Sequence, residues 1–339
     1  MGAAAGYGGV TTPGPPARHE EDTVASTFTQ RQLLEELEPV VAKEIDRHHA
    51  VAKEWMPHEF IPWSQGRDFD GPLGGEAWEP GQSRVSETAR TALVVNLLTE
   101  DNLPSYHREI YQSFGPDGAW GTWIGRWTAE EGRHGIAIRD YLLATRAVDP
   151  VALERERMVH MTQGFSSSYE LDMLHTVAYV SFQELATRIS HRNTGKYTED
   201  PLCEQLLQRI SVDENLHMIF YRNLLGQALE VAPDQTVQAI WDVVEGFEMP
   251  GSTIEGFTRR SLAIALAGIY DLRIHRDEVL APVLRAWKVF DLEGLSPEAE
   301  QAREKLAAFM DELERKASRF EDKRAAQQAR HAARDAARA

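Results

Sequence analysis

The sequence predicts an all-α fold in which a four-helix bundle lies within one larger helical domain. Three observations lead to it. Long stretches repeat apolar residues at helical spacing, and no strand-like alternation of any length occurs. Glu-x-x-His motifs occur at Glu131 and, 83 positions later, at Glu214, and lone glutamates precede them by about thirty residues, at Glu100 and Glu184. Four carboxylates and two imidazoles on four helices are the ligands of ferritin-like di-iron or di-manganese bundles.

The chain is expected to begin with a disordered tail at residues 1–27. This segment is rich in Gly, Ala and Pro, and no basic start precedes an apolar stretch, so it does not read as a signal peptide. Thr29 can then cap a helix over 30–53. The stretch 55–82, which contains many Pro, Gly and Trp residues, is predicted to be a long loop of the kind that carries function in compact domains.

A first helical hairpin is predicted from residue 83 onward. Its helices cover 83–114 and 119–145, and the turn 115–118 makes them antiparallel. Glu100 lies nearly as many residues before that turn as Glu131 lies after it. At about 1.5 Å per residue, both stand about 20 Å from the turn and face each other at one level.

A second hairpin has the same plan. Its helices are predicted over 169–192 and 200–229, with the connector 193–195 ending the first and an Asp-Pro pair starting the second. Glu184 precedes the end of the connector, and Glu214 follows the start of the second helix. These two intervals agree to within about one helical turn. The two hairpins therefore look like structural duplicates.

The remaining elements are also predicted to be helical. Helices are expected over 237–248 and 257–289, and a charged amphipathic helix over 297–316. An Ala/Arg-rich flexible tail is expected at 321–339, because it has no apolar stripe. The expected organisation is a single metal-binding helical domain at 28–320 between two tails.

Composition limits the function. The 339-residue chain has a net charge of −17 and a sequence pI near 5.2, which argues against nucleic-acid binding. Cys203 is its only cysteine, so an intramolecular disulfide and a thiolate-ligated cluster are excluded, and a reducing cytoplasm is expected. The longest apolar stretch, near 262–270, is far shorter than a membrane span.

The spacing itself favours metal chemistry. Glutamate at i and histidine at i+3 share one helix face, so each motif directs one carboxylate and one imidazole inward. Buried carboxylates without a counter-charge cost several kcal/mol each, and two divalent cations would neutralise four of them. The alternative, two solvated surface pairs, does not explain why Glu100 and Glu184 follow apolar stretches at 93–98 and 177–182.

Other candidate residues receive a structural interpretation. The pair His48-His49 lacks the companion clusters of membrane-bound desaturases. His160, His175 and His275 are expected to be core or surface residues rather than ligands. The tryptophans at 120, 123 and 127 are interpreted first as core packing.

The motif surroundings resemble the soluble acyl-acyl-carrier-protein desaturases, both the plastid stearoyl type and its actinobacterial relatives. The resemblance spans about residues 30–290. It is carried by the segments Trp55–Pro62 (WMPHEFIP), Thr99–Tyr106 (TEDNLPSY), Trp127–Gly135 (WTAEEGRHG), Ser181–His191 (SFQELATRISH) and Asp213–His217 (DENLH).

The resemblance implies roles for individual residues. The iron ligands would be Glu100, Glu131, His134, Glu184, Glu214 and His217. Thr187 would lie beside the oxygen-binding face, where its hydroxyl assists proton delivery, although alone it would read as a helix threonine that bonds back to a carbonyl. Asp213 would orient a ligand histidine, and Trp55 would belong to an electron path from the surface.

The implied reaction is the oxygen-dependent insertion of a cis double bond into a saturated acyl chain on acyl carrier protein. It requires two Fe ions (Fe²⁺/Fe³⁺), a ferredoxin-like electron donor and O₂, and the expected assembly is a homodimer. Two departures stand out: Gly132 replaces a frequent polar residue, and the 115–118 turn is shorter than in plant members.

Three alternatives stay open at this point. One is a ferritin-type iron-handling protein, which is usually about half this length. Another is a di-iron oxygenase of secondary metabolism. The last is an inactive relative that binds carrier protein, which the presence of all six ligands disfavours.

Overall fold

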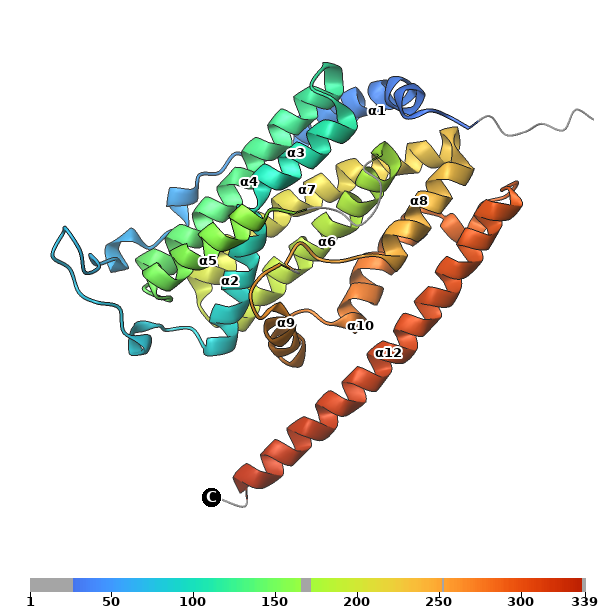
Figure 1. Cartoon of the computed structure of the whole chain (residues 1–339). Coiled ribbons are helices and arrows are strands. Elements are labelled where there is room, and N and C mark those ends of the chain that lie inside the picture. Colours follow the sequence, from blue (N-terminus) through green and yellow to red (C-terminus); the bar gives the residue numbers. More distant parts are fainter. Residues whose placement is uncertain (1–26, 166–171, 252, 337–339) are drawn as a thin grey trace, which may run out of the picture.

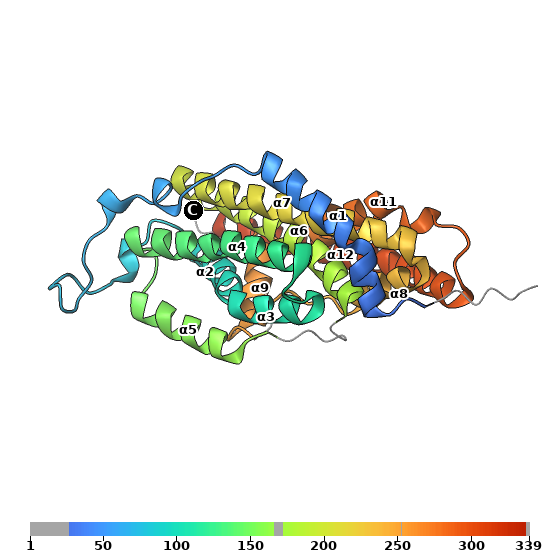
Figure 2. The same ribbon diagram turned by 90° about the horizontal axis from the view of Figure 1, so that it is seen from above.

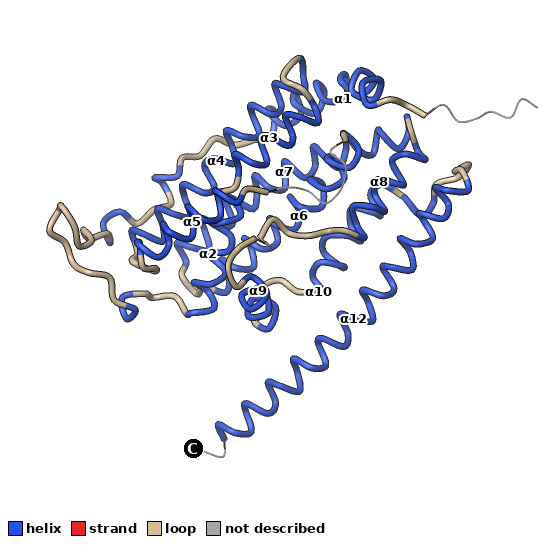
Figure 3. The backbone as a smooth tube through the Cα atoms, in the orientation of Figure 1, coloured by secondary structure: helices blue, strands red, loops and turns tan. Residues whose placement is uncertain are grey.

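The computed structural model describes residues 27–165, 172–251 and 253–336. Its centre is formed by α2 (Glu87–Asp101), α4 (Gly118–Ala144), α6 (Met173–Tyr197) and α7 (Pro201–Val231), which run side by side (Figure 1). Figure 3 shows helices and loops but no strand in the described residues. The expected all-α, ferritin-like bundle inside a larger helical domain is thereby confirmed.

The first helix, α1 (Gln30–Val51), lies across the bundle. Thr29 caps it, and its hydroxyl and the Gln32 side chain form the capping box. The buried residues Leu33, Leu37 and Val41 continue toward its last turn, and the helix packs against α4 and α7 (Figure 2). The end of α1 is thereby brought to the middle of the bundle.

The loop that follows α1 is irregular, as expected. It contains the short 3₁₀ turns η1 (Pro57–Glu59), η2 (Trp63–Gln65) and η3 (Pro80–Gln82). The buried guanidinium of Arg146 anchors it by hydrogen bonds to backbone carbonyls of the loop.

The predicted single helix 83–114 is wrong. The chain forms α2 and then α3 (Leu103–Phe114), with a break at Asn102. Pro104 explains the break, because proline has no N–H for the carbonyl of Glu100 and its ring clashes with that carbonyl. Glu100 therefore lies in the last turn before an interrupted helix.

The predicted connector at 193–195 is also wrong, because α6 continues through it to Tyr197. Gly195 allows α6 and α7 to approach each other rather than ending the helix. A Cβ there would lie 3.1 Å from the Glu204 Cα and 3.2 Å from the Leu207 Cβ. The helix ends at Thr198, followed by Glu199 in the left-handed region.

One helix was not predicted. α5 (Pro150–Gln163) starts at the N-cap Asp149, but it buries only Leu153 and His160, so its apolar pattern is weak. α8 (Pro233–Glu245) matches the expected helix over 237–248 to within a few residues.

The predicted helix 257–289 is broken into shorter pieces. They are α9 (Phe257–Leu266), α10 (Leu272–Ile274), the π-helical turn η4 (His275–Leu280) and α11 (Ala281–Trp287). Gly268, at φ +73°, ends the first piece.

The last helix, α12 (Pro297–Ala336), extends well beyond the expected end near residue 316. Its first half packs on α8, and its second half projects along the molecule away from α8 (Figure 1). Ala, Arg and Gln are strong helix formers, which accounts for the extension into the segment expected to be a flexible tail. Residues 1–26 and 337–339 of the two expected tails lie outside the described residues. Among the described helices, none is long and apolar enough to cross a membrane.

Candidate metal centre

Six predicted side chains meet in the core of the bundle. Glu100 comes from α2, Glu184 from α6, and each Glu-x-x-His motif from α4 or α7. All six are buried: His134 and His217 are 0% exposed, Glu184 and Glu214 1%, Glu131 7% and Glu100 8%. The carboxylates and imidazoles therefore lie together, as expected from counting residues along the two hairpins.

The six side chains form two overlapping groups. One contains Glu100, Glu131, His134 and Glu214, and the other contains Glu131, Glu184, Glu214 and His217; in each, one donor atom per residue lies within 4.8 Å of the others. Glu131 and Glu214 belong to both groups, and each group has one histidine, so the two groups together could hold two cations.

The donor atoms are suited to cations. His134 Nδ1 lies 3.2 Å from both Glu131 Oε2 and Glu214 Oε1, and His217 Nδ1 lies 2.7 Å from Glu131 Oε1. Although they lie close together, oxygens of Glu131, Glu184 and Glu214 and the Nδ1 of His217 are buried and make no hydrogen bond of acceptable geometry. Such atoms are costly unless they bind an ion, so the residues fit a dinuclear metal centre.

The electrostatics agree with this interpretation. Burial and the carboxylates of Glu131 and Glu214 raise the pKa of Glu184 well above its usual range. Burial lowers the pKa of His134 and of His217, but Glu131 and the other carboxylates around each ring together outweigh it, and both pKa values lie well above the ordinary one. These raised pKa values favour bound protons when no cation is present, and cations would displace them.

Two further predicted residues, Asp213 and Trp55, form a chain that ends at His134. Asp213 Oδ2 lies 3.5 Å from His134 Nε2 and accepts a 2.7 Å hydrogen bond from Trp55 Nε1. Arg133 donates to the same carboxylate at 3.2 Å, and Arg209 contacts it as well. Burial raises the pKa of Asp213, but hydrogen bonds from His134 and Trp55 lower it to about 2, so this carboxylate stays charged.

Thr187 also lies at the site. Its Oγ1 lies 2.8 Å from Glu214 Oε2, to which it can donate, and 3.0 Å from the carbonyl of Glu184. It therefore combines the carbonyl contact typical of a helix threonine with a contact to the cluster.

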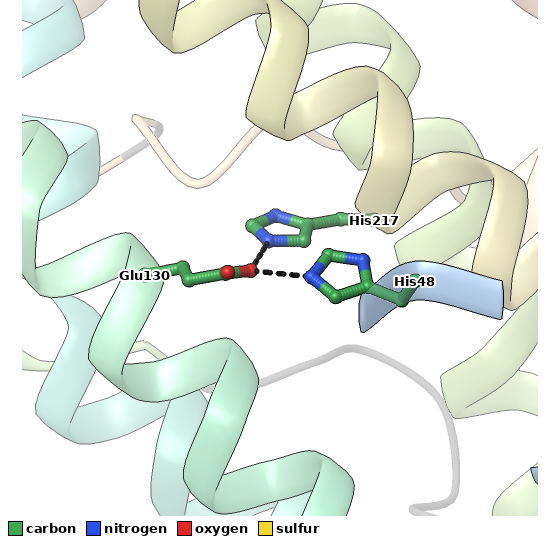
Figure 4. Close-up of side chains that lie close together, drawn as sticks. All are labelled: His48, Glu130 and His217. Carbon is green, nitrogen blue, oxygen red and sulfur yellow. Dashed lines mark hydrogen bonds and ion pairs between the residues drawn. The ribbon is translucent and has the colours of Figure 1, made fainter. Parts of the chain in front are cut away.

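Sequence reasoning missed several contacts. Glu130 Oε2 lies 2.9 Å from the Nε2 atoms of both His217 and His48 (Figure 4). The signal for Glu130 was present: Arg126-x₃-Glu130 before one motif repeats as Arg209-x₃-Asp213 before the other. His48 had no such signal, and its structural interpretation did not include this contact.

Two more missed partners hold the unshared glutamates. His191 Nε2 lies 2.8 Å from Glu100 Oε1, and Trp127 Nε1 donates a 2.8 Å hydrogen bond to Glu184 Oε1. The position of His191, two helical turns after Glu184, placed it on the same face of α6 and was a usable signal.

The three histidines that were expected to be core or surface residues make their contacts outside the cluster. His160 contacts Asn102 at 3.4 Å, His175 contacts Asp172 at 2.7 Å, and His275 contacts the Tyr270 hydroxyl at 2.9 Å. Their interpretation as structural residues agrees with these contacts.

A cavity of about 290 Å³ reaches the cluster from one side. Glu100 and Glu131 line it, together with Gly132, Arg157 and the exposed Ile136. These two glutamates are the more exposed of the four.

Comparison with known proteins places these residues in context. Residues 29–336 match the family described as fatty acid desaturase. A Mycobacterium tuberculosis protein named as an acyl-acyl-carrier-protein desaturase, DesA1, is 49% identical over 305 residues, which cover 88% of this chain and 90% of the relative.

Plant proteins and a solved structure are also similar. The chloroplastic stearoyl-acyl-carrier-protein 9-desaturase 5 of Oryza sativa is 29% identical over 307 residues, covering 86% of this chain and 75% of the relative. The X-ray structure of the M. tuberculosis protein titled as an acyl-ACP desaturase, DesA2, matches with a TM-score of 0.66 at 32% identity. It covers 80% of this chain and 98% of the other.

Proposed function

The chain belongs to the fatty acid desaturase family, and on that premise we propose that it inserts a cis double bond into a saturated acyl chain carried on acyl carrier protein. The observation that carries the proposal is the buried pair of overlapping carboxylate and histidine groups. The names of the relatives supply the acyl-carrier-protein substrate class.

Two iron ions would be held by the six side chains Glu100, Glu131, His134, Glu184, Glu214 and His217. When bound, they supply the redox chemistry that breaks an unactivated C–H bond, which no protein acid or base achieves. In balance, dioxygen, two electrons and two protons are consumed, two hydrogen atoms leave adjacent methylenes, and two waters are released.

The surrounding side chains would orient ligands and move protons and electrons. Thr187 holds a proton at Oγ1 beside Glu214, where it can be passed into the site. Asp213 fixes the ring of His134, and Trp55 extends this contact toward the loop as the route for electrons.

The proposed partners follow from the reaction. Electrons come from a ferredoxin-like donor, and the acyl chain arrives on its carrier protein. We expect a homodimer formed through α3, α4 and α5, because these helices expose large apolar side chains: Tyr111, Ile136, Val151, Met158 and Val159.

The decisive experiment combines iron analysis with product analysis. The purified protein should contain about two iron ions per chain, and saturated acyl carrier protein supplied with ferredoxin, reductant and O₂ should yield a product two hydrogens lighter. A Glu131→Ala protein, in which the shared carboxylate is lost, is the matched negative control.

Two results would contradict the proposal. A protein with fewer than about one metal ion per chain, and no replacement metal, would exclude the dinuclear centre. A protein that stores many iron atoms in a shell-sized assembly, without forming a product, would be an iron-handling protein instead.

A further inference from the structure

The acidic residue before the glutamate of each Glu-x-x-His motif contacts the histidine of the opposite hairpin. Glu130 on α4 lies 2.9 Å from Nε2 of His217 on α7, and Asp213 on α7 lies 3.5 Å from Nε2 of His134 on α4. In both cases the contact is made to the ring nitrogen that faces away from the cluster. Such outer contacts fix the tautomer and the orientation of a metal-binding imidazole.

The other partners of these two carboxylates differ. Asp213 is bound by the indole of Trp55, whereas Glu130 is contacted by the imidazole of His48 (Figure 4). Arg126 contacts the other oxygen of Glu130. The two metal positions would therefore have chemically different surroundings.

His48 is held firmly in this place. It is 1% exposed, in the last turn of α1, and its ring meets the edge of Trp123 at 5.2 Å between centroids. It also stacks with the ring of His217, with an interplanar angle of 21° and centroids 5.9 Å apart. An imidazole in the core of a bundle needs a polar partner, and His48 Nε2 lies within ion-pair distance of Glu130 Oε2, at 2.9 Å, although neither ring nitrogen makes a hydrogen bond of acceptable geometry.

We propose that His48 is a positioning residue: it holds the Glu130 carboxylate, which in turn orients His217 toward the metal ion bound by Glu184 and His217. Because Glu130 Oε2 is shared by both imidazoles, removing one changes where that oxygen sits for the other. Trp55 and Asp213 serve the other metal ion, so the two ions respond to different residues. This inference rests on the dinuclear iron centre proposed above.

Ferrous-ion binding to the metal-free protein tests the role of His48. His48→Leu fills the buried space but removes the polar contact, and we expect one of the two ions to bind about 10-fold or more weakly, in the range found for such outer partners. His48→Gln, whose amide nitrogen can reach Glu130, should restore much of the affinity. His49→Leu, at the adjacent exposed position, is the matched control and should bind like wild type.

Mössbauer spectra of the ⁵⁷Fe-loaded proteins separate positioning from packing. His48→Leu should alter the signal of one iron, and Trp55→Phe should alter that of the other. A packing role predicts the reverse ranking, with the apolar Leu variant close to wild type and the Gln variant impaired.

Two outcomes would overturn the inference while leaving the dinuclear centre intact. In the first, the His48→Leu protein binds both ions with wild-type affinity and gives the wild-type spectrum. In the second, His48→Leu changes both iron signals equally. Wild-type protein that fails to bind two ions would instead count against the proposed function.

Discussion

The hydroxyl of Thr187 on α6 lies 2.8 Å from Glu214 Oε2 on α7, across the two helices that supply half of the cluster. A short proton path to this carboxylate would use the Thr187 hydroxyl. We expect Thr187→Val to retain two iron ions and to form product about 10²-fold more slowly, the range for a lost general acid.

Thr187→Ser is the control, because it keeps the hydroxyl at the same position. The measurement is the rate of product formation by proteins of equal iron content. Equal rates in the Val and Ser proteins would show that the hydroxyl has no part in proton delivery.

Removing a shared ligand should have a larger effect than removing an unshared one. Glu131 belongs to both groups of donors, whereas Glu100 belongs to one. We expect Glu131→Ala to lose most of its iron and Glu100→Ala to retain about one ion, because the group around His217 stays complete. Iron per chain, measured by elemental analysis, tests this, with Glu154→Gln on the surface of α5 as control.

Trp55→Phe keeps an aromatic ring in place but removes the N–H that donates to Asp213. We expect normal iron content and slower electron delivery. Steady-state turnover with ferredoxin should fall, while a single turnover of chemically reduced protein should not. Trp63→Phe, in an exposed part of the same loop, is the control. Equal loss in both assays would assign Trp55 a structural role only.

Metal binding should release protons. Burial and neighbouring carboxylates raise the pKa of Glu184 well above its ordinary range. Burial lowers the pKa values of His134 and His217, but the surrounding carboxylates together raise both well above the ordinary value. Cations must displace these protons, so ferrous-ion affinity should increase as pH rises. Proton release on adding metal to a weakly buffered protein measures the effect directly. Binding with no proton release would contradict the charges assigned to the site.

His275 should make the fold sensitive to acid. Burial lowers its pKa from 6.5 to about 4, so the unfolded chain takes up the proton more readily than the folded one. Stability from this group is complete above pH 6.5 and is lost as pH falls toward 4, by up to about 3 kcal/mol. His275→Gln should show a smaller loss across that window in urea unfolding. Above pH 7 the two proteins should differ by a constant amount.

The cluster could be predicted because its geometry is local. Glu131 and His134 share a helix face by spacing alone, and counting from a short turn places Glu100 opposite them. His48 could not be predicted in this way. Its position depends on how α1 crosses α4 and α7, which is decided by packing between distant segments.

Local sequence signals decide the conformation at some positions, and tertiary contacts override them at others. Pro104 interrupts the helix after Glu100, as its missing N–H requires. The sequence predicts a helix end at Gly195, but the helix continues, and a Cβ there would lie only 3.1 Å from the Glu204 Cα of the closely packed α7. Tertiary contact therefore decided the conformation at Gly195, and backbone chemistry decided it at Pro104.

The sharing of Glu131 and Glu214 between both groups has a consequence for assembly. Each hairpin owns three of the six donors, and neither group is complete within one hairpin. A chain cut between the hairpins would give two fragments that bind no ion tightly alone. Mixing them with ferrous ions should then make them associate. Metal binding would therefore be coupled to the association of the two hairpins and would report it.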